Sequence, residues 1–167
     1  MSSKTSKRSV LWWGLFAGAT ALAAQLGRAA TKRPSRSVWY RALSKPKAQP
    51  PAWVFGPVWS ALYGAMSYSA FRVFRQPRSE ERDRALRLWW TQLALNGAWS
   101  PLFFGAHKPR LAMADLVALT VTVVDYTRTA AKVDRPAAWL MAPYLGWLGF
   151  AGYLNGSIVH RNLRLAA

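Results

Sequence analysis

Aromatic side chains at four-residue intervals are the groups in this sequence best suited to chemistry. Phe55, Trp59 and Tyr63 follow one another at this spacing, so on a helix they would share one face. The whole chain of 167 residues holds 10 Trp, 6 Tyr and 7 Phe. A face of rings suits a flat, largely apolar ligand, which would be held by stacking.

Two further stripes could complete such a site. One combines amides with rings on a single helix face: Gln92, Asn96, Trp99 and Phe103. The other combines rings with a small residue: Tyr144, Trp147 and Ala151. If the three stripes converge, they form an aromatic slot in which amides orient the ligand. The alternative is ordinary helix packing, and Asn96 serves equally well as a hydrogen-bonding link between helices or as a ligand contact.

Most other site chemistries find no support in the residues. The chain has no cysteine, which removes thiolate catalysis and thiolate metal sites. His107 and His160 are the two histidines, and neither belongs to the stripes. No Ser-His-Asp set, metal-ligand cluster or Gly-rich phosphate loop is recognisable. The sequence therefore predicts no catalytic residue, no metal and no cofactor.

Long uncharged runs are the elements that would position these stripes. They are Val10–Leu26, Pro50–Phe71, Leu88–Ala106 and Pro136–Val159, and a fifth run is apolar apart from Asp115 and Asp125: Leu111–Tyr126. About 20 apolar residues cross a bilayer as a helix, the form that satisfies backbone groups in lipid. The predicted fold is all-α, an integral membrane bundle of five transmembrane helices near residues 10–27, 50–74, 86–106, 109–128 and 134–161. The domain plan is a basic tail (1–9), a transmembrane domain (10–162) with a long loop (28–49), and a C-terminal tail (163–167).

The net charge of +17 has two interpretations. One is nucleic-acid binding. The other is contact with anionic lipid headgroups, which we favour because the basic residues sit between apolar runs and form no continuous face. We therefore expect membrane lipid, and no nucleic acid, among the partners. The basic residues divide almost evenly between the two sides, so the orientation in the membrane stays open.

The first uncharged run also has two interpretations. Lys4, Lys7 and Arg8 before an apolar stretch are typical of a signal peptide. The length of the run and the pair Trp12–Trp13 favour a retained helix with an interfacial anchor.

Three long motifs carry a resemblance to a known family. They read WYRALSKPKAQPPAWVFGPVWSALY from Trp39, QLALNGAWS from Gln92 with FFG from Phe103, and PYLGW from Pro143 with Asn155 and Asn162 further on. In this order they resemble the signature of the TspO / translocator protein family, the tryptophan-rich sensory proteins also known as peripheral benzodiazepine receptors. The resemblance covers the chain from about Trp39 to Asn162.

The resemblance implies a function and a site. It implies a five-helix membrane bundle, commonly a homodimer, in a bacterial envelope or the mitochondrial outer membrane, with a ligand pocket near one end roofed by the first loop. Family ligands include porphyrins, sterols and benzodiazepine-type compounds, so the expected function is a membrane receptor or carrier for porphyrin-type tetrapyrroles with a role in their transport or regulation. Alternatives are a regulatory scaffold, or an enzyme of light-dependent porphyrin degradation acting through Trp59 and Trp147. The expected ligand-binding residues are Trp39, Tyr40, Phe55, Trp59, Tyr63, Asn96, Trp99, Trp147 and Ala151.

The first loop is expected to be ordered as a lid. Its aromatic residues Trp39 and Tyr40 would pack inward, and the Pro50–Pro51 pair would stiffen the entry to the second helix.

Overall fold

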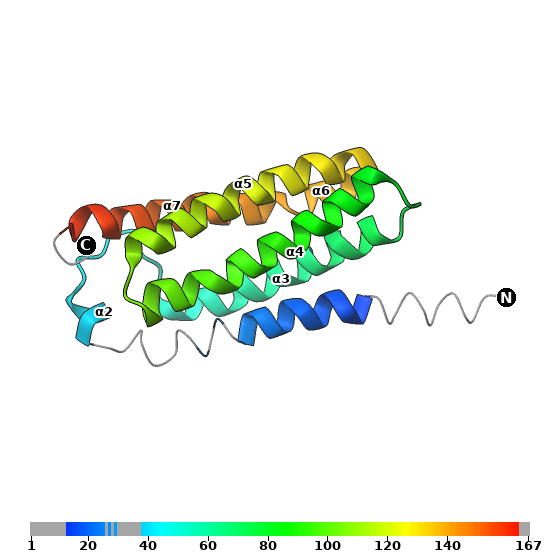
Figure 1. Ribbon diagram of the computed structural model, residues 1–167. Coiled ribbons are helices and arrows are strands. Elements are labelled where there is room, and N and C mark those ends of the chain that lie inside the picture. Colours follow the sequence, from blue (N-terminus) through cyan, green and yellow to red (C-terminus); the bar gives the residue numbers. More distant parts are fainter. Residues whose placement is uncertain (1–12, 26, 28, 30–37, 164–167) are drawn as a thin grey trace.

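A computed structural model describes residues 13–25, 27, 29 and 38–163, and this part of the chain folds as an elongated bundle of helices without strands (Figure 1). The long helices are α3 (Ala52–Phe74), α4 (Glu80–Ser100), α5 (Pro109–Val133) and α7 (Ala142–Arg161). The short elements are α2 (Val38–Ala42), α6 (Arg135–Trp139) and the π-helical turn η2 (Pro101–Gly105). Residues 13–25 form a further helical stretch, whose Phe16 ring contacts Phe74 of α3 and Trp89 of α4. The all-α prediction is confirmed.

The helix starts have local causes that the uncharged runs do not reveal. The Ser79 hydroxyl accepts a hydrogen bond from the Arg82 backbone N–H at 3.1 Å, and acidic residues fill the first turn of α4. Both features stabilise a helix N-terminus. The helix therefore begins at Glu80 and not near residue 86. The predicted end of the fourth helix, at residue 128, is too early. α5 continues five residues further, to Val133, because a charged side chain does not end a helix.

The prediction of one helix over 134–161 is wrong. The segment forms α6, a turn at residues 140–141, and then α7. Pro143 explains the break, because it has no N–H and its ring would clash with the carbonyl of Trp139 in a continuous helix. Asp134 begins α6 by accepting a hydrogen bond from the Ala137 N–H.

Pro101 has a similar effect at the end of the third predicted helix. It cannot donate to the carbonyl four residues earlier, and the chain widens there into η2, in which the Ala106 N–H donates to the Pro101 carbonyl at 2.8 Å. After this turn His107 takes a φ of 56°, the one positive φ of a non-glycine residue in the described ranges. Such a backbone conformation costs on the order of 1–3 kcal/mol.

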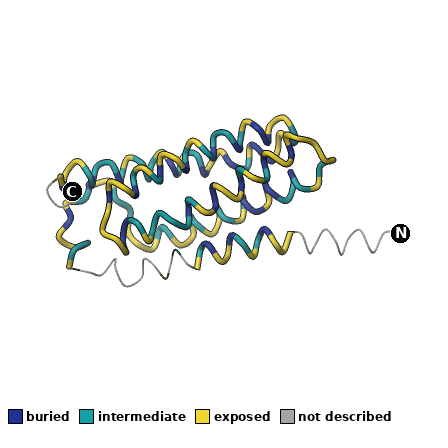
Figure 2. Tube along the Cα trace, in the orientation of Figure 1, coloured by how far each residue is buried: buried dark blue, intermediate teal, exposed yellow. Residues whose placement is uncertain are grey.

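The core runs the length of the bundle between the helices (Figure 2). Its largest fully buried side chains include Trp89 of α4, Tyr126 of α5 and Tyr144 of α7. The Trp89 indole donates to the carbonyl of Met66 at 3.0 Å, which satisfies its polar atom. A smaller core of Leu43, Phe103, Phe104, Ala112 and Ile158 lies at the end where α7 terminates.

A polar network closes the opposite end. The Arg72 guanidinium donates two hydrogen bonds to the Asp134 carboxylate, at 3.1 and 3.2 Å, and Gln76 donates a third. Nearby, the Ser69 hydroxyl donates to the Ala137 carbonyl at 2.7 Å and shares a hydrogen bond with the Tyr126 hydroxyl. This network joins α3 to α5 and α6, because Asp134 lies between the latter two.

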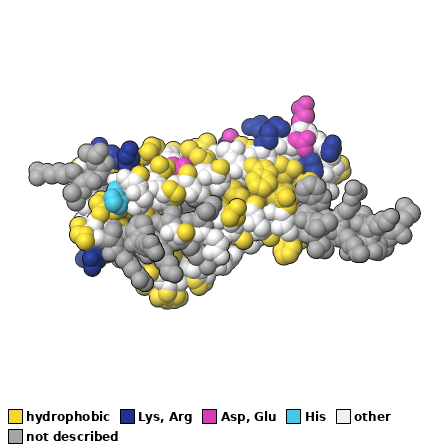
Figure 3. All heavy atoms as spheres, turned by 60° about the horizontal axis from the view of Figure 1, so that its bottom comes forward, with side chains coloured by type: hydrophobic (Ala, Val, Ile, Leu, Met, Phe, Trp, Pro, Cys, Tyr) yellow, Lys and Arg dark blue, Asp and Glu magenta, His cyan; other side chains and the backbone are white. Residues whose placement is uncertain are grey.

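Lys and Arg side chains gather toward the two ends of the described surface, while hydrophobic side chains cover much of the flank between them (Figure 3). Within the part of the chain that the structure describes, no helix combines the length and the mean hydropathy expected of a membrane span. The predicted tail 1–9, the anchor residue Trp12, and residues 164–167 lie outside the described residues.

Candidate functional site

Five aromatic rings from α3 and α7 meet in the middle of the molecule, and we call them the central cluster. They are Phe55, Trp59, Tyr63, Tyr144 and Trp147. The Trp59 ring stacks on Tyr63 with centroids 5.2 Å apart and meets Trp147 edge-on at 6.1 Å. The Phe55 ring also meets the Trp147 ring edge-on, with centroids 5.8 Å apart. The α3 and α7 stripes therefore converge as the sequence predicts.

A buried amide links the central cluster to α4. The Tyr63 hydroxyl donates to Asn96 Oδ1 at 2.7 Å, and Asn96 Nδ2 donates to the Tyr144 hydroxyl at 2.8 Å. Tyr144 is fully buried and Asn96 is 9% exposed. One amide thus joins three helices and fixes the orientation of two rings of the cluster.

Two neighbouring polar groups on α4 have no such partner. Gln92 lies one turn before Asn96 and is fully buried, yet neither of its amide atoms has a hydrogen-bond partner among the described residues. The indole N–H of Trp99 is likewise buried, with no partner in the described part of the chain. An unsatisfied buried polar group costs about 1–3 kcal/mol. The α4 stripe therefore carries polar atoms to which no described residue hydrogen-bonds.

A second group of rings, which we call the end cluster, lies over the smaller core. It consists of Trp39 and Tyr40 from α2, Trp99 from α4, and Phe103 and Phe104 from η2. Trp99 stacks on Phe103 at 5.0 Å, Trp39 meets Phe103 edge-on at 5.9 Å, and Tyr40 lies 5.3 Å from Phe104. Trp99 packs against both the smaller core and the main core.

The segment from residue 38 to residue 51, which we call the lid segment, is held by several contacts. Ser44 and Asn162 exchange two hydrogen bonds of 2.9 Å between backbone and side-chain amide. Gln49 donates to the Tyr40 hydroxyl at 2.8 Å, and the Lys45 ammonium lies 4.3 Å from the centre of the Tyr40 ring. Trp39 stacks on His107 at 4.3 Å. The predicted inward packing of Trp39 and Tyr40 is confirmed.

The nine predicted binding residues thus fall into two neighbouring groups. Phe55, Trp59, Tyr63, Asn96 and Trp147 belong to the central cluster or its amide, while Trp39, Tyr40 and Trp99 belong to the end cluster. Ala151 is half-buried and packs against the main core, as Trp147 does. Within each group the rings contact one another directly. Two surface grooves of about 470 and 220 Å³ lie along α7, and none of the nine residues lines either groove.

Several residues of the two clusters and the lid segment were absent from the predicted binding residues, and Tyr144, His107 and Gln49 illustrate why. Tyr144 could have been included, because it lies three residues before Trp147 on the same face. His107 could not, because its position depends on the backbone that follows η2. Gln49 lies in irregular chain, where spacing carries no information on direction. Within the described ranges, no three His, Asp or Glu side chains come together as a metal site would require.

Comparison with known proteins extends the resemblance seen in the motifs. The sequence matches the TspO/MBR family over residues 15–161. It is 44% identical to the translocator protein of Bos taurus over 120 residues, which are 70% of each chain. It is 36% identical to the tryptophan-rich protein TspO of Chlorobaculum tepidum over 137 residues, covering 81% of this chain and 86% of the other. Protein CrtK of Rhodobacter capsulatus is 37% identical over 129 residues, with 77% and 81% covered. None of these names denotes a catalytic activity.

Proposed function

The chain belongs to the TspO/MBR family, and on this premise we propose that it is a membrane receptor or carrier for porphyrin-type tetrapyrroles. Sterols and benzodiazepine-like compounds are further candidate ligands of the same site. The proposed location is a bacterial envelope or the mitochondrial outer membrane, where the chain crosses the bilayer with the helical stretch 13–25, α3, α4 with η2, α5 and α7.

The distribution of side chains supports the membrane placement. Three of the uncharged runs overlap α3, α4 with η2, and α7, and Lys and Arg gather toward the ends of the described surface (Figure 3). Large apolar side chains face outward between those ends: Leu22 is 62% exposed, Val117 52% and Val121 58%. Contiguous exposed apolar surface is typical of lipid contact. Basic ends suit the anionic headgroups on either side.

The central cluster is the observation that carries the ligand proposal. Five rings from two helices are arranged edge-on and stacked, with Asn96 beneath them. A flat macrocycle would enter by separating these rings and would gain ring contacts on its faces. Gln92 and the Trp99 indole would supply hydrogen bonds to its polar edge, since both lack partners among the residues that the structure describes.

The lid segment supports an acidic ligand in particular. It brings the Lys45 ammonium to 4.3 Å from the centre of the Tyr40 ring, which belongs to the end cluster. An ammonium group there would meet a carboxylate of a porphyrin in a charge-assisted hydrogen bond. The protein needs no metal ligand for this mode of binding.

We include homodimer formation in this proposal. The family resemblance implies it, and Gly14 and Gly18 form a pair at a spacing that allows two helices to approach closely. A Cβ atom at either glycine would meet nothing within 4 Å, so this face of the helical stretch is open to a partner.

A porphyrin titration tests the proposal. The purified protein in detergent is titrated with protoporphyrin in the dark, with tryptophan quenching as the signal, for the wild type, Trp59→Leu and Trp139→Leu. Trp139 is the matched control because it is 76% exposed and outside both clusters. We expect saturable binding to the wild type. The affinity should fall about tenfold in Trp59→Leu, a loss of about 1.4 kcal/mol in binding free energy, and should be unchanged in Trp139→Leu.

The same samples separate the alternative functions. Illumination followed by spectroscopy should leave the porphyrin spectrum as it is in detergent alone. A defined product that forms faster with protein, and more slowly in Trp59→Leu, would favour the degradative enzyme. No saturable binding to the folded wild type would contradict the receptor and leave the regulatory scaffold.

A further inference from the structure

Asp115 is an acidic side chain in the middle of the bundle that none of the contacts above accounts for. It lies on α5 one turn before Leu119 and three residues after Ala112, which are both buried, so it is on the core side of the helix. Its Oδ2 atom is buried and has no hydrogen-bond partner among the described residues. The two ion pairs in the described part of the chain do not include it.

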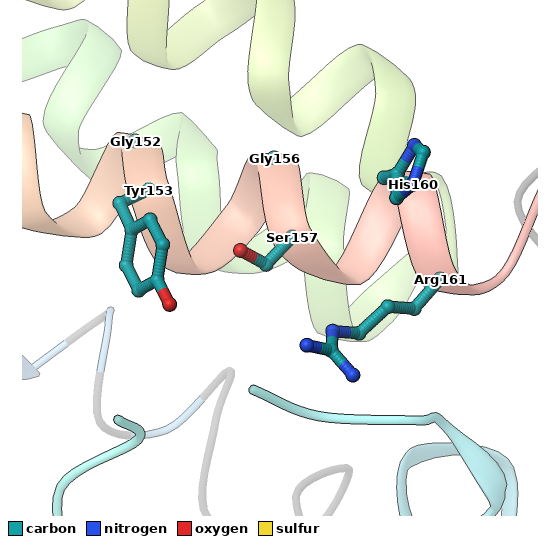
Figure 4. Close-up of a pocket in the computed structure, with 6 residues that line it drawn as sticks. All are labelled: Gly152, Tyr153, Gly156, Ser157, His160 and Arg161. Atoms are coloured by element: carbon teal, nitrogen blue, oxygen red, sulfur yellow. The ribbon is translucent and has the colours of Figure 1, made fainter. Parts of the chain in front are cut away.

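The neighbouring helices offer Asp115 no positive charge. α4 and η2 are uncharged over residues 88–106, and α3 is uncharged over residues 52–71. α7 is uncharged until its last turn, where Figure 4 shows His160 and Arg161 at the end of the helix. The basic residue of α6 is Arg135, which follows the far end of α5, roughly 27 Å along that helix at 1.5 Å per residue.

The charged residues of α5 itself do not neutralise Asp115 either. Arg110 lies five residues earlier, on another face of the helix, and its guanidinium donates to the Leu163 carbonyl at 3.3 Å. In the other direction the next charged residue is Asp125, which is also acidic. A carboxylate without a counter-charge at membrane depth is costly, so such residues are candidates for a functional role.

Asp115 lies beside the hydrogen-bonded amide of the central cluster. It interacts electrostatically with Tyr144, whose hydroxyl accepts a hydrogen bond from Asn96 at 2.8 Å. The turn between α4 and α5 gives the same placement. Asn96 lies nine residues before the end of η2 and Asp115 six residues after the start of α5, so both are on the order of 10 Å from the turn. A ligand that separates the rings of the central cluster would therefore enter next to Asp115.

Ligand entry would change the surroundings of this carboxyl group in two ways. Asp115 as a whole is half-buried, so part of the side chain stays accessible in the ligand-free protein. An apolar macrocycle between the rings would cover that part, and the carboxylates of a porphyrin would add negative charge to the site. Loss of water and approach of like charge both favour the neutral form of a carboxyl group.

We propose that Asp115 couples ligand binding to proton uptake. For each porphyrin-type ligand that binds, the Asp115 carboxylate takes one proton from solution, and it returns the proton when the ligand leaves. The coupling rests on the proposed function, because it concerns the same site. Since the ligand-bound state holds the extra proton, the affinity rises as the pH falls, by at most about tenfold per pH unit. A carrier with this coupling loads its ligand on the more acidic side of a membrane and releases it on the more alkaline side.

A pH series of the dark titration tests the coupling. The probe is protoporphyrin dimethyl ester, whose blocked carboxyl groups do not titrate. Between about pH 5 and pH 8 the affinity of the wild type should fall several-fold per pH unit. A pH-indicator dye in weakly buffered detergent should report about one proton taken up per ligand bound.

Variants of the two acidic residues of α5 assign the proton to one of them. Asp115→Asn should bind the ester with an affinity that is independent of pH and should take up no proton, and Asp115→Ser is a second neutral variant. Asp125→Asn is the matched control and should keep the wild-type slope, because Asp125 is also half-buried and also outside both ion pairs. Protonation of the macrocycle nitrogens is common to all these samples, so the difference between slopes reports the residue.

Three results would overturn the coupling. One is binding of the ester to the wild type without proton uptake. Another is an equal slope in the wild type and in folded Asp115→Asn. The third is an equal loss of slope in Asp115→Asn and Asp125→Asn, which would indicate a diffuse effect of charge. All three leave the receptor for porphyrins in place, whereas the absence of saturable binding at every pH would remove the proposed function and the coupling with it.

Discussion

Ser44 and Asn162 bind each other in both directions across 118 residues of sequence. The Ser44 backbone N–H donates to Asn162 Oδ1, and Asn162 Nδ2 donates to the Ser44 carbonyl, each at 2.9 Å. Asn162 is buried at the end of α7, and its side chain also donates to the Ile158 carbonyl. This pair holds the lid segment against the end of the bundle.

Replacement of Asn162 by Leu should release the lid segment. Two hydrogen bonds are lost, at about 0.5–1.5 kcal/mol each, so the local opening equilibrium should rise about tenfold. Hydrogen–deuterium exchange of a peptide covering residues 38–51 measures this opening. Leu163→Ala, an exposed neighbour, should leave the exchange unchanged. Equal exchange in wild type and Asn162→Leu would mean that the rings of the end cluster hold the segment without this pair.

Replacement of Gln92 by Leu should stabilise the ligand-free protein. Both amide atoms are buried and have no partner in the described ranges, so a side chain of similar size and no polar atoms removes a cost of about 1–3 kcal/mol. Asn96→Leu should do the opposite, because it leaves two tyrosine hydroxyls without their amide. Thermal unfolding in one detergent compares the two variants. A loss of stability in Gln92→Leu would show that a buried water satisfies the amide.

Replacement of Ala151 by Phe should block porphyrin binding while the bundle still folds. Ala151 lies one turn after Trp147 beside the central cluster, and a ring there would take the volume that the ligand needs. We expect the affinity to fall more than tenfold in the dark titration. Trp147→Phe keeps most of the ring and should weaken binding less. Ala142→Phe, on an exposed position of the same helix, is the control. Wild-type binding by folded Ala151→Phe and Trp147→Phe would place the ligand elsewhere.

Replacement of Arg72 by Gln should destabilise the end of the bundle opposite the lid segment. The Asp134 carboxylate is 5% exposed and would keep only its bonds to Gln76 and the α6 backbone. We expect a loss of about 1–3 kcal/mol, below that of a fully buried pair, because Arg72 is one-third exposed. The double variant with Asp134→Asn should recover part of this loss, since Asn also caps helices well. Additive losses in thermal unfolding would contradict a coupled pair.

The order of the long helices could be predicted because uncharged runs separated by charged loops leave few arrangements of the chain. The ends of the helices were harder to predict from the sequence. Ser79 starts α4 by accepting a hydrogen bond from a backbone N–H, and Pro143 divides the last segment into two helices. Both residues lie where the composition of the sequence changes little. Pro101 marks a disturbance, but whether it causes a kink or a π-turn depends on how Phe103 and Phe104 pack.

The candidate site, too, could be predicted from the sequence only in part. Four-residue spacing correctly placed Phe55, Trp59 and Tyr63 on one face, because helix geometry alone determines that face. Spacing could not distinguish Gln92 from Asn96. Their difference depends on whether a hydroxyl of another helix reaches the amide, and the Tyr63 and Tyr144 hydroxyls both bond to Asn96. The positive φ of His107 follows from η2 and leaves no trace in composition.

The pairing of Ser44 with Asn162 also imposes an order on biosynthesis. A ribosome that adds about 5–20 residues per second needs on the order of 6 to 24 seconds to make the 118 residues between them. Throughout that time the nascent lid segment lacks Asn162, and α3, α4 and α5 are all translated before that residue. The lid segment is therefore fastened to α7 only after α7 has been translated, and a protein truncated before Asn162 keeps its rings but lacks the Ser44–Asn162 pair.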